Sequence, residues 1–388
     1  MPSPISEISY RVSYARKSCS FSTFQLHARH IFHLRKAVFS FLSRDTATKM
    51  SFYKNSEAAQ IGITAAFCFL VTVDLIGNTL VCLVVYRNRI MRTPMNYLLV
   101  HLAASDITVA IFIAARFIFP LLFEHPKGRA GDVVCQLFTG GAFIWVGALV
   151  SAFSLIFIAL ERYLAIKFPY DERKRVTTAK LKCVVVFSWA FAASWNLPLF
   201  LYARYDPVSE FCRFQWPTAT ITQVHSPLSA VLYGVLPISI MSYLYSKLVY
   251  KLWFRPLVTS TMVQQSKLRY TRKSARLVVT VSVVYSICWI PNLVVYVISS
   301  FSTQQMYSAV HMTSIVLVTL NSAINPVLYS WQSDRFRRHM LALLPFGCST
   351  RQCRVSPAVM SKGNATSKAS RPMQITPLVS RGPVAWTF

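Results

Sequence analysis

Polar side chains that can do chemistry are few in the long apolar stretches of this sequence. Two carboxylates, one guanidinium and a cluster of amides and hydroxyls lie inside such stretches: Asp74, Asp106, Arg116, Asn321, Ser322 and Asn325. Oxygen-bearing side chains in apolar surroundings bind a small hard cation or an ordered water cluster. The alternative is a network of hydrogen bonds that joins packed helices. The residue types alone leave both interpretations open.

The chain that contains these side chains is strongly apolar in composition. Of the 388 residues, 54% are hydrophobic and only 14% are charged, and the mean hydropathy is +0.42. Because an ordinary soluble domain contains about 25% charged residues, a soluble enzyme is not expected. The sequence also contains no metal-ligand cluster and no nucleophile–base pair of the kind that enzymes use.

The apolar residues form seven runs, each close to the roughly 20 residues that a helix needs to cross a bilayer. They cover residues 59–86, 97–123, 135–160, 183–202, 227–250, 277–299 and 308–331. A helix satisfies its own backbone hydrogen bonds, so each run is predicted to be a transmembrane helix. The predicted fold is an all-α membrane protein, a seven-transmembrane helix bundle.

Basic residues predict how the bundle lies in the membrane. Eighteen lie in or beside the segments after the first, third and fifth runs, against four after the second, fourth and sixth. Basic segments stay in the cytoplasm, so we expect a multi-pass plasma membrane protein with its N-terminus outside and its C-terminus inside. The formal charge of +28 is attributed to loops that face anionic lipid; no motif for binding nucleic acid occurs.

The N-terminal segment disagrees with this orientation. Residues 1–56 contain nine basic residues and few acids, and the part around residues 27–44 resembles a mitochondrial transit peptide. A second methionine, Met50, begins a more ordinary extracellular tail. One hypothesis is that translation starts at Met50, and peptides from residues 1–49 in mass spectra of the native protein would exclude it.

Two of the nine cysteines are expected on the oxidising side of the membrane. Cys135 begins the third run and Cys212 lies between the fourth and fifth, so these two form the credible disulfide pair. Such a bond would hold the loop between the fourth and fifth runs over the bundle. Cys348 and Cys353 follow the last run on the other side, where palmitoylation and free thiols are the alternatives.

Short motifs in the seven runs resemble those of the rhodopsin-like (class A) G-protein-coupled receptors, over residues 59–340. They are Gly77-Asn78, Leu102-Ala103-Ala104-Ser105-Asp106, Glu161-Arg162-Tyr163, Trp189, Pro237 with Tyr245, Cys288-Trp289-Ile290-Pro291 and Asn325-Pro326-Val327-Leu328-Tyr329. Any one of them is weak evidence, whereas the ordered set with its own motif in each run is specific. The resemblance also supports the Cys135–Cys212 disulfide and implies a short amphipathic eighth helix around Phe336.

The resemblance implies roles for these residues. An allosteric sodium ion is the one cofactor expected, because the family binds it in its inactive state at the positions of Asp106, Ser151, Asn321, Ser322 and Asn325. The coupling and switch residues are Glu161, Arg162, Tyr163, Tyr245, Trp289, Pro291 and Tyr329. An extracellular ligand favours the open form, which exposes an inner surface to a heterotrimeric G protein. Arrestin, a receptor kinase and membrane lipid are further implied partners.

Two departures from the family pattern bear on function. Tyr285 replaces the usual phenylalanine one turn from Trp289, and its hydroxyl needs a partner. The interval from Cys135 to Arg162 is longer than usual and contains Gly140-Gly141, which predicts a bulge or a longer helix top.

The absence of two residue types narrows the set of possible ligand classes. The third run has no aspartate, which amine receptors need, and the seventh has no lysine, which retinal requires. Residues 159–166 and the short third inner loop look most like neuropeptide receptors, so we expect a peptide ligand. The alternatives are a receptor for a lipid or other small molecule, a constitutively active orphan receptor and, in another class, a transporter.

The ligand-pocket candidates are Arg116, Trp145, Trp289, Tyr296 and His311. Arg116 is the best polar candidate because it can pair with a ligand carboxylate or donate to carbonyls. The alternatives are an internal ion pair with Glu124 and a side chain that extends to the membrane surface.

The chain is predicted to divide into an N-terminal extracellular tail over residues 1–56, the bundle over 57–332, the amphipathic eighth helix over 333–346 and a disordered cytoplasmic tail over 347–388.

Overall fold

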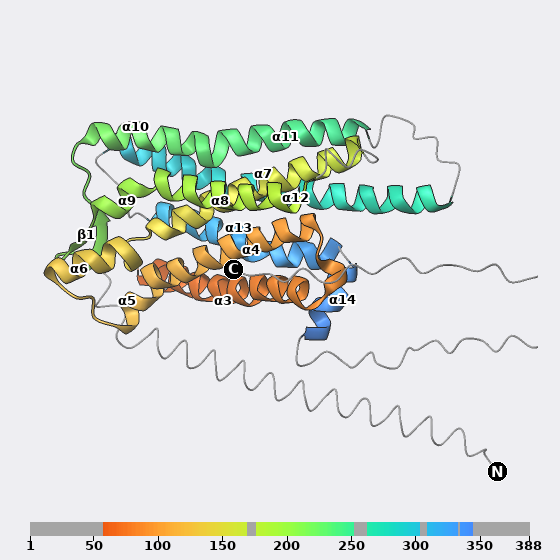
Figure 1. The fold of residues 1–388 in the computed structure, drawn as a ribbon. Helices are drawn as coiled ribbons and strands as arrows, with labels where there is room; N and C mark the ends of the chain where they lie inside the picture. The colour runs from red at the N-terminus through yellow and green to blue at the C-terminus, as the bar shows by residue number, and fades with distance from the viewer. Residues whose placement is uncertain (1–56, 169–175, 252–261, 303–308, 333, 344–388) are drawn as a thin grey trace, which may run out of the picture. The chain divides into compact units, whose positions relative to one another are not determined.

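The computed structural model describes residues 57–168, 176–251, 262–302, 309–332 and 334–343. The predicted N-terminal tail with Met50, the palmitoylation candidates Cys348 and Cys353, and the predicted C-terminal tail lie outside these residues. Figure 1 shows the described residues as long helices that run beside one another, with a two-stranded hairpin at one end.

Each of the seven predicted runs corresponds to a helical segment of the described residues. The segments are α3 (Glu57–Arg87), α4 (Pro94–Ile113), α7 (Ala142–Lys167), α8 (Thr178–Trp195) with α9 (Leu197–Tyr202), α10 (Ala219–Ala230) with α11 (Leu236–Val249), α12 (Met262–Phe301) and α13 (Ala309–Gln332). Shorter elements are η1 (Arg89–Met91), α5 (Phe119–Leu122), α6 (Gly128–Val134) and α14 (Asp334–Leu343).

Six helices of the described residues are long and apolar enough to cross a membrane. The segment outside this set is α8, whose first turns carry Lys180 and Lys182. These charges lower its mean hydropathy, because lysine is the most costly kind of residue in hydrocarbon. Since α8 packs against α7 and α9 continues the same run, the two together supply the fourth predicted span.

Several predicted boundaries were wrong by some residues. The third run was predicted to begin at Cys135, whereas α7 begins at Ala142; the fifth was predicted from residue 227, whereas α10 begins at Ala219. Helix α14 (Asp334–Leu343) lies within the segment 333–346 predicted as the eighth helix, whose residues 333 and 344–346 lie outside the described residues. Hydrophobicity marks the depth of the bilayer, whereas helices end where their backbone hydrogen bonds end, so the two boundaries differ.

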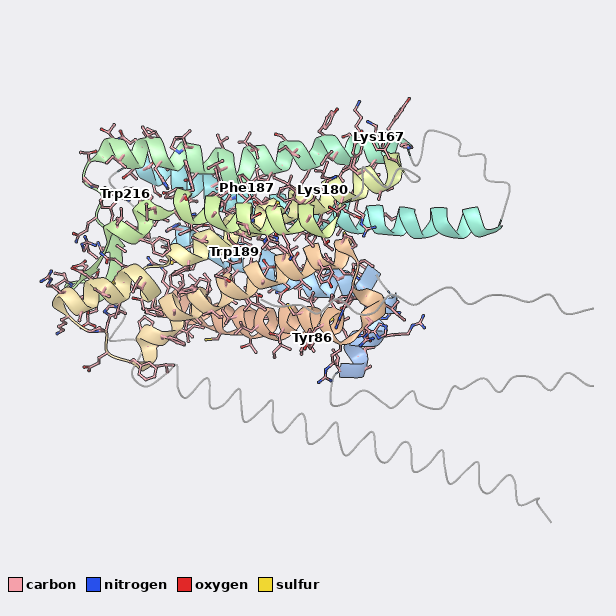
Figure 2. All side chains as sticks on the ribbon, in the orientation of Figure 1. Tyr86, Lys167, Lys180, Phe187, Trp189 and Trp216 are labelled. Atoms are coloured by element: carbon pink, nitrogen blue, oxygen red, sulfur yellow. A yellow bond between two sulfur atoms is a disulfide. The ribbon has the colours of Figure 1, made fainter. Side chains whose placement is uncertain are left out.

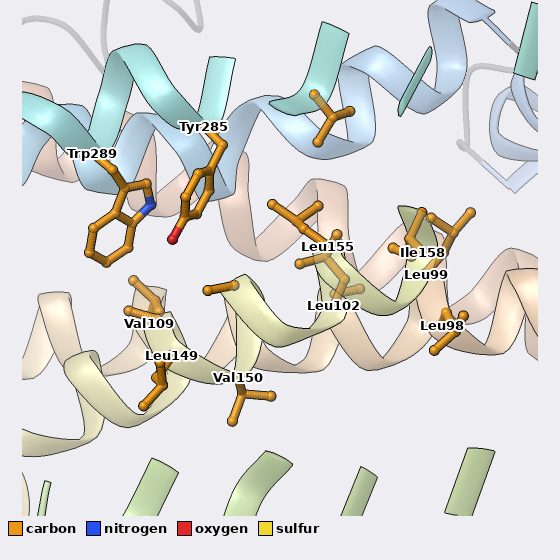
Figure 3. Close-up of a cluster of buried hydrophobic side chains, with 14 of the residues drawn as sticks. Leu98, Leu99, Leu102, Val109, Leu149, Val150, Leu155, Ile158, Tyr285 and Trp289 are labelled. Atoms are coloured by element: carbon orange, nitrogen blue, oxygen red, sulfur yellow. The ribbon is translucent and has the colours of Figure 1, made fainter. Parts of the chain in front are cut away.

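The core lies where α7 meets its neighbours. Helix α7 contacts α4, α8, α11 and α12, while α13 contacts α3, α4 and α12. Leu102 of α4 and Leu149 of α7 are completely buried there. Figure 3 shows Tyr285 and Trp289 next to each other on α12, facing Val109 and Leu149. Aromatic residues of α12 therefore pack directly on the central helices.

The two ends of the bundle differ in their residues. Figure 2 shows Trp216 at one end, next to the hairpin, and Lys167 at the opposite end. We call the first the hairpin end and the second the Arg162 end, because Arg162 lies in the last turns of α7.

The hairpin lies between α9 and α10. Its strands, β1 (Ala203–Asp206) and β2 (Phe211–Phe214), pair antiparallel with Tyr205 opposite Cys212. Helix α6 contacts β1, so the hairpin is attached to the segment that leads into α7.

π-helical turns interrupt the long helices at η2 (Ala114–Ile118), η3 (Cys135–Thr139) and η5 (Val231–Val235). The bulge predicted before Arg162 is confirmed, because the π-helical turn η3 is followed by Gly140-Gly141, where Gly141 has a φ of 86°. Such turns occur frequently at functional sites.

Candidate functional site

A disulfide attaches the hairpin to the bundle. Cys135 of η3 is bonded to Cys212 of β2, with their Cα atoms 5.6 Å apart, and both residues are buried. The predicted disulfide is confirmed. Because β2 pairs with β1, this bond holds both strands across the hairpin end.

The interruption before α7 depends on its two glycines. A Cβ on Gly140 would collide with the carbonyl oxygen of Cys135, and a Cβ on Gly141 would lie 2.8 Å from Cδ of Arg116. Gly141 also has the positive φ that L-residues with a Cβ rarely adopt. Because the backbone leaves the helical path here, nearby carbonyls need donors from outside the helix.

Arg116 of η2 supplies these donors. Its Nη1 donates to the carbonyl oxygens of Thr139, at 3.0 Å, and Gly140. Its Nη2 donates to the carbonyl oxygen of Cys212 at 3.3 Å, and the guanidinium lies 4.5 Å from the ring centre of Phe211. The side chain is only 7% exposed. Arg116 thus makes internal contacts with backbone carbonyl oxygens, which the sequence did not indicate.

A cavity lies at the hairpin end. Four of the five predicted ligand-pocket residues line it: Arg116, Trp145, Tyr296 and His311. The fifth, Trp289, is not among the lining residues: it is 1% exposed, and its ring lies against those of the wall residues Trp145 and Tyr233. Rings from neighbouring helices cover it.

The sequence did not single out the residues that supply much of the polar wall. His225 lies between Trp195 and Trp216, 5.3 Å from each ring centre. Its Nδ1 is 3.2 Å from the hydroxyl of Tyr296. His225 and Trp216 belong to the segment between the hairpin and the fifth run, where no motif marks them.

A second pair of polar wall residues joins three helices. The amide of Asn196 donates to the Tyr233 hydroxyl at 2.9 Å, and this hydroxyl donates to the carbonyl oxygen of Trp145 at 3.0 Å. No acidic residue is found among the described residues that line the cavity, and Arg116 is the permanently charged one. The wall is therefore aromatic and hydrogen-bonding.

A stack of rings connects the cavity with α12. The ring centre of Trp289 is 5.5 Å from those of Tyr233 and Tyr285 and 6.4 Å from that of Trp145. The hydroxyl of Tyr285 donates to the carbonyl oxygen of Tyr233 at 2.5 Å. The expectation that this hydroxyl needs a partner is confirmed. Pro291 lies inside the same helix, half a turn further on.

A buried polar centre lies around Asp106 of α4. Asn325 donates to its Oδ2 at 2.8 Å and Ser151 to its Oδ1 at 3.2 Å, and the Ser322 hydroxyl lies against the same carboxylate. The structure therefore brings together four of the five predicted sodium-site residues. Asn321 is not among the residues that hydrogen-bond Asp106, and its buried Oδ1 has no hydrogen-bond partner among the described residues.

A second buried carboxylate, Asp74 of α3, borders this centre. Its Oδ1 accepts from Nδ2 of Asn78 at 2.6 Å, and the same Nδ2 is 3.4 Å from the carbonyl oxygen of Ser322. The other side-chain oxygens of Asp74 and Asn78 have no partner among the described residues. A centre rich in buried acceptors fits a hard cation, which takes oxygen ligands.

The Arg162 end contains the predicted coupling residues. Nε of Arg162 is 3.3 Å from Oε2 of Glu161, and Tyr163 follows in the same helix. Tyr245 of α11 and Tyr329 of α13 are both buried. Neither hydroxyl makes a well-aligned hydrogen bond to a described residue.

Comparison with protein families matches residues 77–329 to the seven-transmembrane receptors of the rhodopsin family. The chain belongs to this family. It is a rhodopsin-like (class A) G-protein-coupled receptor, hence a multi-pass membrane protein and a receptor rather than an enzyme.

Several curated proteins are similar to this receptor along most of their length. It is 26% identical to the QRFP-like peptide receptor of Branchiostoma floridae over 297 residues, which cover 73% of this chain and 75% of that protein. It is 27% identical to the substance-P receptor of Aquarana catesbeiana over 302 residues, which cover 73% and 71%. With the neuromedin-U receptor 1 of Homo sapiens it shares 28% over 327 residues, or 75% of each chain.

Proposed function

We propose that this receptor binds an extracellular peptide at its hairpin end and activates a heterotrimeric G protein by opening its Arg162 end. Similar proteins include receptors named for peptides, among them the QRFP-like peptide receptor and the substance-P receptor. The lack of an acidic residue among the described residues of the cavity wall argues against an amine ligand, because an ammonium group needs a carboxylate.

The contact between the cavity wall and Trp289 is the observation that carries this proposal. Tyr233 and Trp145 belong to the wall and their rings lie against Trp289. A ligand that displaces either ring therefore changes the packing of Trp289 on α12. Pro291 has no N–H to donate to the preceding turn, which makes α12 easier to bend at this level.

Bending of α12 moves the half of this helix that lies towards the Arg162 end away from α7 and α11. The ligand favours this open form only to the extent that it binds the open form more tightly than the closed form. The guanidinium of Arg162 then leaves Glu161 and faces the G protein. Tyr245 and Tyr329, which are buried without well-aligned partners, would pack beside it.

We place the receptor in the plasma membrane with its N-terminus outside and its C-terminus in the cytoplasm. The excess of basic residues beside the first, third and fifth spans supports this orientation. Arrestin and a receptor kinase are further proposed partners on the cytoplasmic side, and membrane lipid surrounds the bundle.

We also propose that the centre around Asp106 binds sodium in the closed form. Asp106, Ser151, Ser322 and Asn325 supply the oxygen atoms. The ion compensates the negative charge of a carboxylate that is completely buried. Movement of α13 relative to α4 would separate Asn325 from Asp106 and weaken this site.

The proposal is tested by measuring second-messenger release in cells that express the chain. The cells are challenged with a library of amidated and free-acid peptides, and a receptor with Arg162→Ala serves as the coupling control. A dose-dependent response that is lost in the control, at equal surface expression, supports a peptide receptor. No response to any peptide, combined with a response to lipids or small molecules, would replace the peptide proposal with the alternative ligand class.

A high signal without any ligand would favour a constitutively active receptor. That alternative depended on Tyr285, whose hydroxyl is bonded to the Tyr233 carbonyl oxygen. This bond joins α12 to η5 and thereby supports the closed form, so we expect low basal activity.

A further inference from the structure

A histidine lies against the disulfide that attaches the hairpin to the bundle. Nε2 of His125 is 3.8 Å from Sγ of Cys135 and 3.7 Å from Sγ of Cys212. The same nitrogen is 2.9 Å from the hydroxyl oxygen of Thr139, and this oxygen is 3.1 Å from Sγ of Cys212. One nitrogen, two sulfur atoms and one oxygen therefore meet at a single point. We call His125, Cys135, Thr139 and Cys212 the sulfur–histidine cluster.

Three separate segments contribute the cluster. His125 precedes α6, Cys135 and Thr139 belong to η3, and Cys212 belongs to β2. Tyr205 of β1, which pairs with Cys212, stacks on the imidazole of His125. Their ring centres are 4.5 Å apart and their planes differ by 3°. The position of the imidazole is therefore determined by packing against the hairpin.

The hydrogen bonds of His125 leave the lone pair on the nitrogen that lies beside the sulfur atoms. Nδ1 is 2.9 Å from the carbonyl oxygen of Pro126. A carbonyl oxygen only accepts, so Nδ1 carries the proton of the neutral ring and Nε2 carries the lone pair. Metal-bound histidines have the same arrangement, because their second ring nitrogen usually donates to a carbonyl or a carboxylate. His125 is thus oriented as a metal ligand would be.

The distances within the cluster match those of a zinc site. In a tetrahedral site with Zn–S of about 2.3 Å and Zn–N of about 2.0 Å, the nitrogen lies about 3.6 Å from each sulfur. The separations of 3.8 and 3.7 Å in the structure are close to this value. The two sulfur atoms of such a site are about 3.8 Å apart. Only these two atoms would have to separate, and reduction of their bond permits this movement.

We propose that the reduced form of the receptor binds one zinc ion through Sγ of Cys135, Sγ of Cys212 and Nε2 of His125. A zinc ion with three protein ligands takes an oxygen ligand in its fourth position. The Thr139 hydroxyl is the oxygen that lies beside two of the three ligand atoms. The ion replaces the disulfide as the link between β2 and η3, so the hairpin stays attached after reduction.

The reaction that forms this site needs a dithiol, such as the reduced active-site cysteine pair of a thiol oxidoreductase. A thiolate of the dithiol attacks one sulfur of the Cys135–Cys212 bond, and the dithiol leaves as its own disulfide. It supplies two electrons and two protons, and the broken bond becomes two thiols. Zinc binding then releases both protons to water, because the thiolate is the form that binds a metal.

The burial of the cluster favours a zinc ion with two thiolates. Cys135 is 0% and Cys212 2% exposed, and an uncompensated charge at such a place is strongly unfavourable. The two charges of Zn²⁺ cancel those of the two thiolates. The cluster contains no carboxylate, and calcium and magnesium take oxygen ligands, whereas sulfur and imidazole ligands suit zinc.

The link between β2 and η3 also bears on the cavity at the hairpin end. Phe214 of β2 and Arg116 line this cavity, and Arg116 donates to the carbonyl oxygen of Cys212. Reduction without a metal ion frees β2 from η3, whereas bound zinc keeps Cys212 within reach of Arg116. The inference concerns the attachment of the hairpin, so it does not depend on a peptide ligand or on a G protein.

Zinc binding is tested with the purified full-length receptor in nanodiscs, without any ligand. The disulfide is reduced with a phosphine under argon in either ZnCl₂ or EDTA. Zinc is then counted by elemental analysis after gel filtration, and the thiols are alkylated and mapped by mass spectrometry. We expect one more zinc ion per chain in the reduced receptor than in the oxidised receptor. Cys135 and Cys212 should be alkylated at least about tenfold more slowly in zinc than in EDTA, since zinc occupies their sulfur atoms.

His125→Phe removes the nitrogen ligand but keeps a ring beside Tyr205, and its disulfide can still form before reduction. His339→Phe on α14 is the matched control, because His339 is also partly buried and lies outside the cluster. Loss of a residue that only orients a ligand weakens metal binding by about 10–100-fold, so loss of the ligand itself should weaken zinc binding at least about tenfold. The protection of both cysteines should therefore disappear in His125→Phe and persist in the control.

Thermal unfolding of the same samples measures whether zinc takes over the role of the disulfide. The reduced wild type should unfold at a higher temperature in zinc than in EDTA, and reduced His125→Phe should show no such difference. An equal zinc content of the oxidised and reduced receptors, or equal protection in His125→Phe and the wild type, would overturn the proposal. Failure to find a peptide agonist leaves these measurements unaffected, because they use neither peptide nor G protein.

Discussion

The guanidinium of Arg116 donates a hydrogen bond to the carbonyl oxygen of Cys212 at 3.3 Å. Arg116 comes from η2, and Cys212 is already attached to η3 by its disulfide. One buried cation therefore fastens the hairpin to two segments of the bundle. This arrangement assigns a structural role to the residue that the sequence favoured as a ligand contact.

Arg116→Ala is therefore expected to lower the stability of the receptor. Hydrogen bonds to charged groups contribute about 1.5–3 kcal/mol each, so we expect a loss of at least about 2 kcal/mol. Thermal unfolding of the purified receptor measures this loss, and surface expression should fall together with ligand potency. Arg129→Ala, an exposed position on α6, is the control without effect. A fall in potency at full expression and stability would instead restore the ligand-contact interpretation.

Gly141→Ala is expected to destabilise the interruption before α7. The φ of 86° is unfavourable for alanine by about 1–2 kcal/mol, and the added Cβ would lie 2.8 Å from Cδ of Arg116. Gly62→Ala is the control, because a Cβ there meets no atom within 4 Å. Thermal unfolding should show a loss of stability for Gly141→Ala and none for Gly62→Ala. Equal stability of both variants would mean that this backbone adopts another conformation.

Tyr285→Phe removes the hydrogen bond to the Tyr233 carbonyl oxygen. We expect a loss of about 1 kcal/mol in stability and higher basal nucleotide exchange, because the bond joins α12 to η5 in the closed bundle. Tyr243→Phe is the control, because this side chain is 62% exposed. It should change neither the stability nor the basal nucleotide exchange. Basal exchange that stays the same in Tyr285→Phe would show that this bond does not restrain α12.

The proposed sodium site predicts different effects for two of its sequence candidates. Replacing KCl with NaCl at equal ionic strength should raise the unfolding temperature of the wild type. Ser151→Ala removes a direct contact of Asp106 and should abolish this rise. Asn321→Ala should keep it, since Asn321 is not among the side chains that hydrogen-bond Asp106. Loss of the sodium effect in both variants would support the five-residue site expected from the sequence.

The hairpin is expected to lose stability in acid through Asp206. Its carboxylate accepts from the Ser209 hydroxyl at 2.6 Å and lies 3.3 Å from Nε of Arg213. These contacts, the Ser209 hydrogen bond first, lower the pKa of Asp206 below its ordinary value. The stabilisation is present above the unfolded pKa of about 4 and is lost as the pH falls through the folded pKa.

Asp206→Asn removes this titration. The stability of the variant should therefore vary less with pH in the acid range than that of the wild type. The comparison uses thermal unfolding of the purified receptor from neutral pH downward. The difference is expected to be small, because the pair is partly exposed to solvent and screened by salt. Parallel curves for the two proteins would mean that Asp206 is not stabilised by its neighbours.

The sequence by itself determined the membrane character, the seven spans, the disulfide and the family. Runs of about 20 apolar residues are unambiguous, because no water is available in the bilayer to satisfy an open backbone. Motifs such as Glu161-Arg162-Tyr163 then identify each span independently of its exact boundaries. The bulge at Gly140-Gly141 was also predicted, since two glycines and a lengthened interval coincide there.

Only the tertiary structure decided which side of each helix faces the cavity, the core or the lipid. In a bilayer the lipid-facing and the buried surfaces are both apolar, so the pattern of hydrophobic residues does not reveal the face. The sequence therefore did not indicate that His225 lines the cavity at the hairpin end, or that Ser242 of α11 and Ser286 of α12 line the same groove. Likewise, the carbonyls that Arg116 binds became available only because the backbone leaves the helix at Gly141, and contacts between separate segments depend on how they pack.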